Sequence, residues 1–218
     1  MQRDQNLKDK KRKYSCFEEK WPREFNPVKI VKRWGRNVKH AYQRIMYGYC
    51  DRDVWSIDWW FLSVVPNMLQ DLRETTHGFP QEVADMVGYD SNREDAEEKE
   101  VEAVKLWDSI LEEMVLLFRE ANEDTCQCKN PYDAEWHKAC EEFEQKYGFW
   151  GEKLQTEEDI LEEKESGSHR MYLPHDVPKY KEISEKHLAA SHELAEYQHR
   201  CKNKGMELFN QWFWDLWD

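Results

Sequence analysis

The sequence predicts an all-α protein, a compact bundle of five or six helices with long connecting loops. Its apolar residues recur every three or four positions in each long run, which is the spacing of one helix face. Eight glycines and seven prolines among 218 residues leave few positions that interrupt a helix. Charged residues make up 35% of the chain, which suits helices with solvated outer faces.

The chain divides into a charged arm over residues 1–25 and a single helical domain over residues 26–218. The first helix is expected to begin at Asn26-Pro27, since Asn is a good N-cap and Pro suits the first helical position, and to end at Gly48. Its basic residues should face solvent. Its apolar residues should face the core: Val28, Val31, Val38, Tyr42 and Ile45.

A second helix should follow, capped by Asp51 or Asp53 and kinked at Pro66. Its expected core stripe is Val54, Ile57, Phe61, Val65, Met68 and Leu72. Residues 75–80 are typical of a turn.

The clearest helix is expected over residues 91–121, because its apolar residues follow the helical spacing throughout. These residues are Val104, Trp107, Leu111, Met114 and Phe118. A shorter helix should span about residues 133–147, and a last one should run from about residue 179 to the end. The acidic run 157–165 should be exposed.

Charge is unevenly distributed along the chain. Residues 1–47 hold fourteen Lys/Arg against five Asp/Glu, and the remainder holds eighteen against forty. An acidic body repels phosphate backbones, so general nucleic-acid binding is not expected. The basic segment could contact RNA or an anionic membrane, but the charge pattern favours docking on the acidic body of the same chain or of a neighbouring subunit. We therefore predict no membrane partner.

The sequence predicts a cytoplasmic protein. No apolar run follows the charged N-terminus as in a signal peptide, and no stretch approaches a transmembrane span. The six cysteines lack the spacing of a small secreted scaffold, so reduced thiols are expected.

The best candidate site lies around Asp58, which is flanked by tryptophans on an apolar helix. A half-buried carboxylate among indoles must be paired, either in an internal salt bridge or in a ligand pocket. Indole faces can stack on a planar ring while Asp and Arg bind its edge. The candidate ligand-binding residues are Tyr49, Asp51, Arg52, Asp53, Trp55, Asp58, Trp59, Arg73 and His77.

Support for chemistry is weak elsewhere. Cys126, Cys128, His137 and Cys140 offer four zinc-type ligands, but Cys-x-Cys is closer than the usual pair. No phosphate loop, nucleophile elbow or protease signature is present, so we assign no catalytic residue, metal or cofactor.

The C-terminal segment is aromatic on every side of a helix: Phe209, Trp212, Phe213, Trp214, Leu216 and Trp217. Such a segment must be enclosed, either against the Asp58 helix of the same chain or in a subunit interface. With the complementary charges, this pattern predicts a homo-oligomer, most simply a dimer.

The segment 48–80 resembles a motif of uncharacterised phage and prophage proteins, roughly G-[FY]-[SD]-D-x-D-x-W-x-[LF]-D followed by a helix and an H/N-G-[YWF]-P turn. The matching residues are Gly48, Tyr49, Asp51, Asp53, Trp55, Asp58, Gly78, Phe79 and Pro80. Those proteins often end close to FxxLWD, which residues 213–218 match. The resemblance implies a phage accessory protein made in the bacterial cytoplasm.

Three functions follow as hypotheses. The first is a non-enzymatic accessory protein that sequesters a small nucleotide-like ligand, by analogy with phage proteins that counter host defence. The second is an interaction module that inhibits a host factor through its acidic surface. The third is a carboxylate- or metal-dependent hydrolase.

Overall fold

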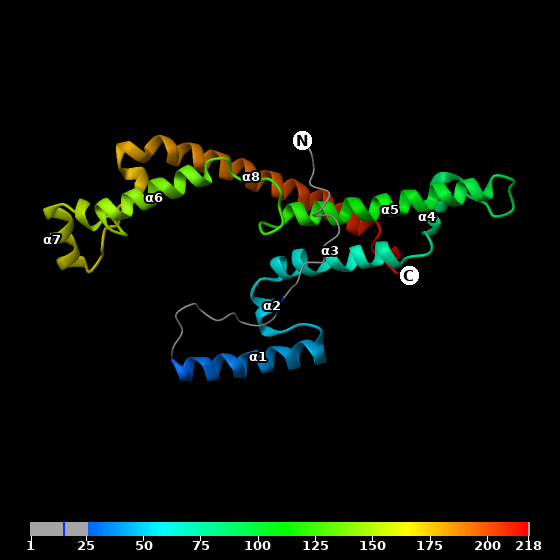
Figure 1. The fold of residues 1–218 in the computed structure, drawn as a ribbon, viewed down its shortest axis with the longest axis horizontal. Coiled ribbons are helices and arrows are strands. Elements are labelled where there is room, and N and C mark those ends of the chain that lie inside the picture. The colour runs from blue at the N-terminus through cyan, green and yellow to red at the C-terminus, as the bar shows by residue number, and fades with distance from the viewer. Residues whose placement is uncertain (1–14, 16–25, 218) are drawn as a thin grey trace. The chain divides into compact units, whose positions relative to one another are not determined.

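The computed structural model describes Ser15 and residues 26–217, and its ribbon is drawn in Figure 1. The described part of the chain is helical and holds no β-strand, which confirms the all-α prediction. It contains eight α-helices rather than five or six, because short helices occupy segments that the sequence analysis assigned to longer helices or to loops. Apart from Ser15, the predicted arm over residues 1–25 lies outside the described residues.

Contacts group the chain into two units, residues 1–125 with 201–218, and residues 126–200. The first unit contains helices α1 to α5 and the C-terminal segment, and the second contains α6 and α7. A single domain over residues 26–218 stays a prediction.

Helix α1 (Pro27–Tyr47) begins and ends where the sequence predicts. The side chain of Asn26 accepts hydrogen bonds from the backbone N–H groups of Val28 and Lys29, at 3.0 and 3.4 Å. Gly48 adopts a left-handed conformation with φ of 78° and donates its N–H to the carbonyl of Arg44. Both local signals therefore form the caps that their residue types favour.

The expected orientation of α1 is wrong. Its five apolar residues predicted inside are 58–82% exposed, whereas Arg33 and His40 are buried. The physical reason is the neighbour: α2 (Asp51–Trp55) offers Asp51 and Asp53, not an apolar surface, so α1 turns polar side chains toward it.

The predicted second helix is divided at Ser56 into α2 and α3 (Ile57–Thr75). Three members of its expected core stripe, Phe61, Val65 and Leu72, do pack against the core. The other three, which lie nearer solvent, are 54–63% exposed, so their assignment to the core is wrong: Val54, Ile57 and Met68.

Helix α4 (Gln81–Val87) follows the turn, and α5 (Ala96–Ala121) forms the centre of the first unit. Helix α5 begins five residues later than predicted, since residues 90–95 form turns. Four of its five predicted core residues are at most 2% exposed, which confirms the stripe: Trp107, Leu111, Met114 and Phe118. Val104 is the exception, at 44% exposed.

The C-terminal segment completes this core. Helix α8 (Pro178–Gln211) ends before the chain does, and a 3-10 turn, η4 (Phe213–Asp215), follows it. The indole of Trp212 packs edge-on against Trp107, with ring centroids 5.4 Å apart. A Cβ at Gly205 would lie 2.9 Å from the ring of Phe118, so α8 needs glycine here to approach α5. The tail is therefore enclosed in part by its own unit.

The second unit is built on α6 (Asp133–Tyr147), η2 (Glu152–Leu154), α7 (Glu157–Ser166), η3 (Pro174–Asp176) and the start of α8. Its buried core consists of Ala139, Phe143 and Tyr180. The acidic run expected to be exposed forms α7, which Thr156 begins with a reciprocal capping box to Asp159.

Asp159 is the most strongly perturbed carboxyl in this unit. It is 4% exposed and accepts hydrogen bonds of 2.8 Å from the backbone N–H and the hydroxyl of Thr156 and from the hydroxyl of Tyr172. These bonds, with the Thr156 N–H contributing most, lower the pKa of Asp159 to about 2.

We expect Asp159→Ala to lower the melting temperature most at pH 5 and above. The folded state binds a proton less readily than the unfolded state, so this stabilisation is present above the ordinary pKa of 3.8 and is lost as the pH falls through about 2. Thermal melting of the parent and the variant between pH 5 and pH 2 should show the difference shrinking. A constant difference across this range would contradict the assignment, and Glu158→Ala at an exposed neighbour is the control.

Candidate functional site

The nine predicted ligand-binding residues lie in the first unit but do not converge on one point. Asp53 is 3% exposed and accepts hydrogen bonds from the guanidinium of Arg44 at 2.5 Å and from the N–H of Cys50 at 2.7 Å. Asp51 accepts from Lys39 and Gln43, both at 2.7 Å, and the bond from Lys39 is the largest cause of its lowered pKa. Both carboxylates therefore hold α2 to α1.

Asp58 is exposed, contrary to the expectation of a half-buried carboxylate. It accepts a hydrogen bond from the hydroxyl of Ser56 at 2.6 Å, at the start of α3. This bond lowers the pKa of Asp58. Trp55 is 92% exposed, and the indole N–H of Trp59 donates to Asp124 at 3.1 Å. The indoles do not enclose Asp58.

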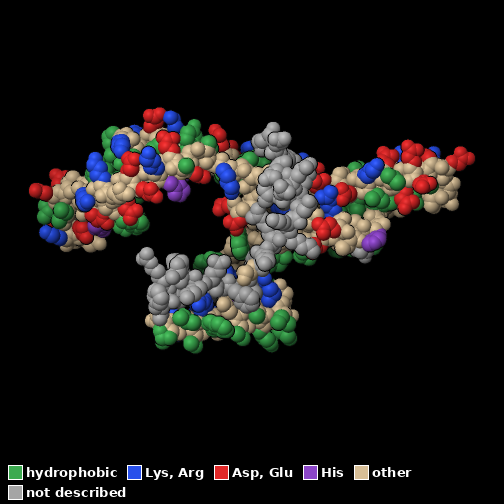
Figure 2. Space-filling view, in the orientation of Figure 1, with side chains coloured by type: hydrophobic (Ala, Val, Ile, Leu, Met, Phe, Trp, Pro, Cys, Tyr) green, Lys and Arg blue, Asp and Glu red, His purple; other side chains and the backbone are tan. Residues whose placement is uncertain are grey.

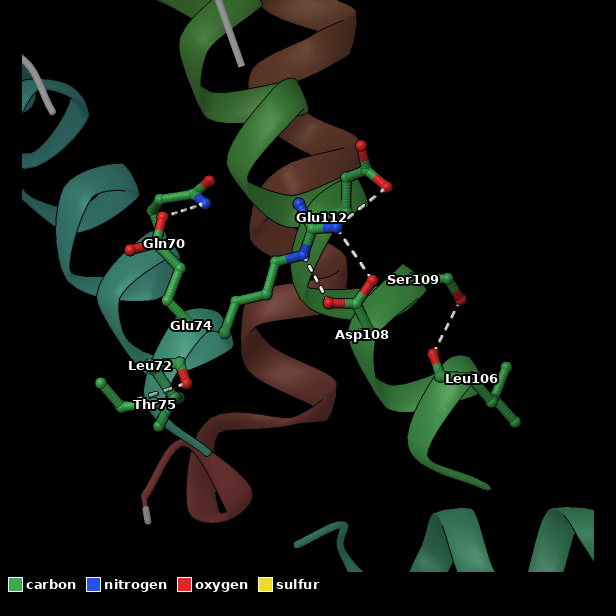
Figure 3. Close-up of polar contacts among 9 residues, drawn as sticks. Gln70, Leu72, Glu74, Thr75, Leu106, Asp108, Ser109 and Glu112 are labelled. Carbon is green, nitrogen blue, oxygen red and sulfur yellow. Dashed lines mark hydrogen bonds and ion pairs between the residues drawn. The ribbon is translucent and has the colours of Figure 1, made fainter. Parts of the chain in front are cut away.

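Arg73 connects α3 to α5 rather than reaching Asp58. Its guanidinium donates two bonds to Asp108, at 2.6 and 2.9 Å, and approaches Glu112 at 3.5 Å. Figure 3 shows both carboxylates projecting from α5 toward this guanidinium. Such a two-pronged pair fixes the geometry of both partners. Arg73 is therefore a structural residue in this unit.

The remaining candidates lie at the surface. Tyr49 is 53% exposed, and Arg52 is exposed on α2. His77 is exposed in the turn after α3. The two described cavities of this unit are lined by other residues, so a ligand pocket around these nine stays a prediction.

A cavity does form where the turn after α3 meets the C-terminal tail. We call it the turn–tail cavity. Its volume is about 100 Å³, and it is lined by Thr76, Gly78, Phe79, Pro80, Trp107, Asp215 and Trp217. The turn at residues 78–80 and the ending at residues 213–218 both belong to the phage-protein resemblance. Residues of these two segments lie side by side at this cavity.

The turn is held in shape by contacts on both sides. Thr76 donates its N–H to the carbonyl of Leu72 at 2.8 Å, which ends α3. The ring of Phe79 packs edge-on against Tyr89, with centroids 5.4 Å apart. Gly78 sits at the cavity, and a Cβ there would meet nothing within 4 Å. The cavity is therefore open at Gly78 and walled by aromatic rings.

Asp215 gives the cavity a carboxyl group. Burial raises the pKa of Asp215, and the charge and hydrogen bond of Glu82 raise it further. Both effects disfavour the carboxylate, so a cation in the cavity would relieve an unfavourable field. Sequence reasoning missed Asp215 as a site residue, although the FxxLWD-like ending marked its neighbourhood.

The four zinc-type ligands of the weak sequence pattern are not brought together in one cluster. Among the described residues, no group of three or more potential ligands joins Cys126 and Cys128 to His137 or Cys140. The Nδ1 of His137 lies 2.7 Å from the carbonyl of Asp133, and burial raises the pKa of the Cys140 thiol. A raised pKa disfavours the thiolate that binds metal.

The start of α5 presents an acidic surface around Val101. The residues of this surface are Glu94, Asp95, Glu97, Glu98, Val101, Glu102 and Lys105. It concentrates five carboxylates against one amine, so its field attracts cations.

No helix in the described part of the chain is long and apolar enough to cross a bilayer. In comparisons with protein-family models, curated proteins and solved structures, the chain matches none of them. What the chain does must therefore be argued from its own residues.

Proposed function

We propose that the chain is a non-enzymatic binding protein that holds one side chain of a protein partner in the turn–tail cavity. The size of the cavity carries this proposal. Its volume is about 100 Å³. Small-molecule sites in proteins usually measure about 300–1,000 Å³, so the cavity suits a single anchoring side chain better than a nucleotide.

The lining defines which side chain fits. Phe79, Pro80 and the indoles of Trp107 and Trp217 offer apolar walls, and Asp215 offers a carboxyl. Lys and Arg combine an apolar stem with a cationic end, and the cation is also attracted to indole faces. The pKa of Asp215 is raised in the chain alone. A partner that inserts Lys or Arg would stabilise the charged form of this carboxyl.

Charge elsewhere on the chain supports a basic partner. Residues 48–218 hold eighteen Lys/Arg against forty Asp/Glu, and the α5 surface concentrates part of this charge. Such a field speeds the encounter with a basic protein. We therefore favour the interaction module among the three hypotheses, as an accessory protein of the phage type that acts on a host factor. The nucleotide ligand stays a prediction.

We expect a displayed random peptide library, panned on the intact protein, to enrich sequences in which Lys or Arg adjoins aliphatic residues. Synthetic versions of the enriched peptides can then be titrated by calorimetry. Asp215→Asn should weaken binding about tenfold or more, because the charge-assisted bond is lost. Gly78→Leu should abolish it, because the new side chain occupies space that is open in the parent.

Asp85→Asn is the matched control, because this exposed carboxylate lies on α4 outside the cavity lining and should leave the affinity unchanged. Calorimetry of the parent with adenine nucleotides and cyclic nucleotides gives the opposing outcome. The ligand hypothesis would replace this proposal if the parent binds a nucleotide, if Asp58→Asn or Trp55→Ala weakens that binding, and if the library enriches no peptide.

A further inference from the structure

Helix α1 presents an apolar surface that no other described residue of its unit covers. Seven of its residues are each 57–82% exposed and form what we call the α1 stripe: Val28, Val31, Trp34, Val38, Tyr42, Ile45 and Met46. Figure 2 shows hydrophobic side chains along the outer edge of this helix. At about 100° per residue, the seven fall within an arc of about 120°.

Ion pairs keep the stripe turned outward. Lys39 and Gln43 bind Asp51, and Arg44 binds the buried Asp53, so α2 lies against the polar side of α1. Burying the stripe within the same chain by rotating α1 would break these contacts. The stripe is therefore held in solvent by the polar contacts on the other side.

The stripe is larger than a soluble monomer usually exposes. If each side chain offers on the order of 100 Å², the seven together offer roughly 700 Å² of apolar surface. The largest patch on a typical monomer is about 300–600 Å², and a stable interface takes about 800 Å² from each partner. The size is that of one half of an interface.

The spacing indicates what the other half is. Positions 28, 31, 35, 38, 42 and 45 are separated by three, four, three, four and three residues, which is the heptad pattern of a coiled coil. All are apolar except Gly35, where a Cβ would meet nothing within 4 Å. We infer that α1 pairs in parallel with α1 of a second copy of this chain, with these six positions facing their counterparts.

Charge along the flanks favours the parallel arrangement. Helix α1 carries six Lys/Arg and no Asp/Glu, so pairing requires that cations stay apart. In this heptad Lys32 and Lys39 take the e positions, and Trp34 and Ala41 take the g positions. A parallel pair places e beside g of the partner, so the aliphatic stem of Lys39, whose ammonium binds Asp51, lies beside an indole. An antiparallel pair would place lysines beside lysines.

Among the described residues of the unit, the contacts of α1 leave room for this pairing. Arg33 and His40 take the f positions, which point directly away from a coiled-coil interface, and both are buried in the chain itself. The contacts to α2 come from Gln43 and Arg44 beside them and from Lys39 at an e position. The α1 stripe can therefore meet a second copy while α2 stays in place.

An anionic membrane is the competing occupant, since basic amphipathic helices also lie on lipid surfaces. Two observations favour a second copy. Lys32 and Lys39 border the stripe on one side, whereas Ile30 and Ala41 border it on the other. The remainder of the chain after residue 47 carries a net charge of −22, which an anionic surface repels.

The test uses the full chain in light scattering after size exclusion at several micromolar concentrations. The parent should elute with the mass of two chains and dissociate on dilution. Val31→Glu with Val38→Glu should raise the dissociation constant at least about hundredfold, because carboxylates would be buried at the interface. Both valines are exposed in the single chain, at 70 and 67%, so the fold should persist.

Val101→Glu with Val104→Glu is the matched control, since these valines are exposed on α5 and should leave the dimer intact. Gly35→Leu should tighten the dimer by filling the gap in the heptad. A monomeric parent, or equal dissociation constants for the two double variants, would overturn the inference. A different outcome would assign the stripe to lipid. In that case the parent would be monomeric in solution and would float with phosphatidylserine-containing vesicles, and Val31→Glu with Val38→Glu would abolish the flotation.

The orientation is tested by a disulfide. In a parallel pair Ile45→Cys faces its own counterpart, so mild oxidation should cross-link two chains well above the background of the native cysteines. Lys29→Cys, off the stripe, should not cross-link above that background. A dimer without the Ile45→Cys cross-link would overturn the parallel arrangement.

Discussion

Replacing Trp107 with alanine should lower the free energy of unfolding by about 3–5 kcal/mol. The indole is 2% exposed and packs against Trp212, and the cluster around it includes Leu111 and Met114. It also walls the turn–tail cavity, so its removal would join new empty space to about 100 Å³ that is already open. The backbone of α5 and the tail cannot both collapse into that volume, which places the cost in the upper part of the range.

Urea denaturation of the parent and the variant measures this cost. Trp55→Ala is the matched control, because the same side chain is 92% exposed on α2 and its loss should change stability by at most about 0.5 kcal/mol. Equal losses for the two variants would contradict the core assignment of Trp107. A large loss for Trp55→Ala alone would show that the segment after α1 is buried in solution.

Local signals predicted the helices well. Asn26, Pro27 and Gly48 act on backbone groups within four residues, so their effect does not depend on the rest of the fold. The stripe of α5 was likewise predictable, because a helix that is surrounded must be apolar on the face it buries. Four of its five predicted residues are buried.

The neighbours of a helix face could not be predicted in the same way. Periodicity identifies that α1 has an apolar face but not whether another element of the chain covers it. The neighbour that the chain supplies is α2, whose Asp51 and Asp53 bind Lys39 and Arg44 instead of offering an apolar surface. For the same reason Asp58 was misplaced: its expected burial depended on Ile57, which is 63% exposed.

The candidate site was predictable in its parts but not as a whole. The sequence marked both the His-Gly-Phe-Pro turn and the aromatic ending. Their convergence depends on Trp107, which lies on α5 far from both segments in sequence. Arg73 similarly finds its partner Asp108 at a separation of 35 residues. Such pairings require the tertiary arrangement of helices, which a single sequence does not specify residue by residue.

Asp53→Asn should free α1 from α2 without unfolding the rest of the unit. The carboxylate accepts bonds from Arg44 and from the N–H of Cys50, and an amide cannot accept both while keeping the charge-assisted contact. Breaking a fully buried ion pair costs about 3–5 kcal/mol, but the Arg44 side chain is 26% exposed, so we expect about 2–3 kcal/mol. The cost should appear as local opening, since α2 is the element that α1 contacts most.

Hydrogen exchange of the α1 amides measures this opening, and the exchange rates should rise about 30- to 150-fold. The experiment is cleanest in the chain that also carries Val31→Glu and Val38→Glu, because pairing with a second copy would protect the same amides. Asp51→Asn is the control: its pair with Lys39 is more than half exposed on both sides, so the rates should rise only a few fold. Unchanged exchange in α1 with faster exchange in α5 would mean that Asp53 stabilises the core of the unit instead of the α1 attachment.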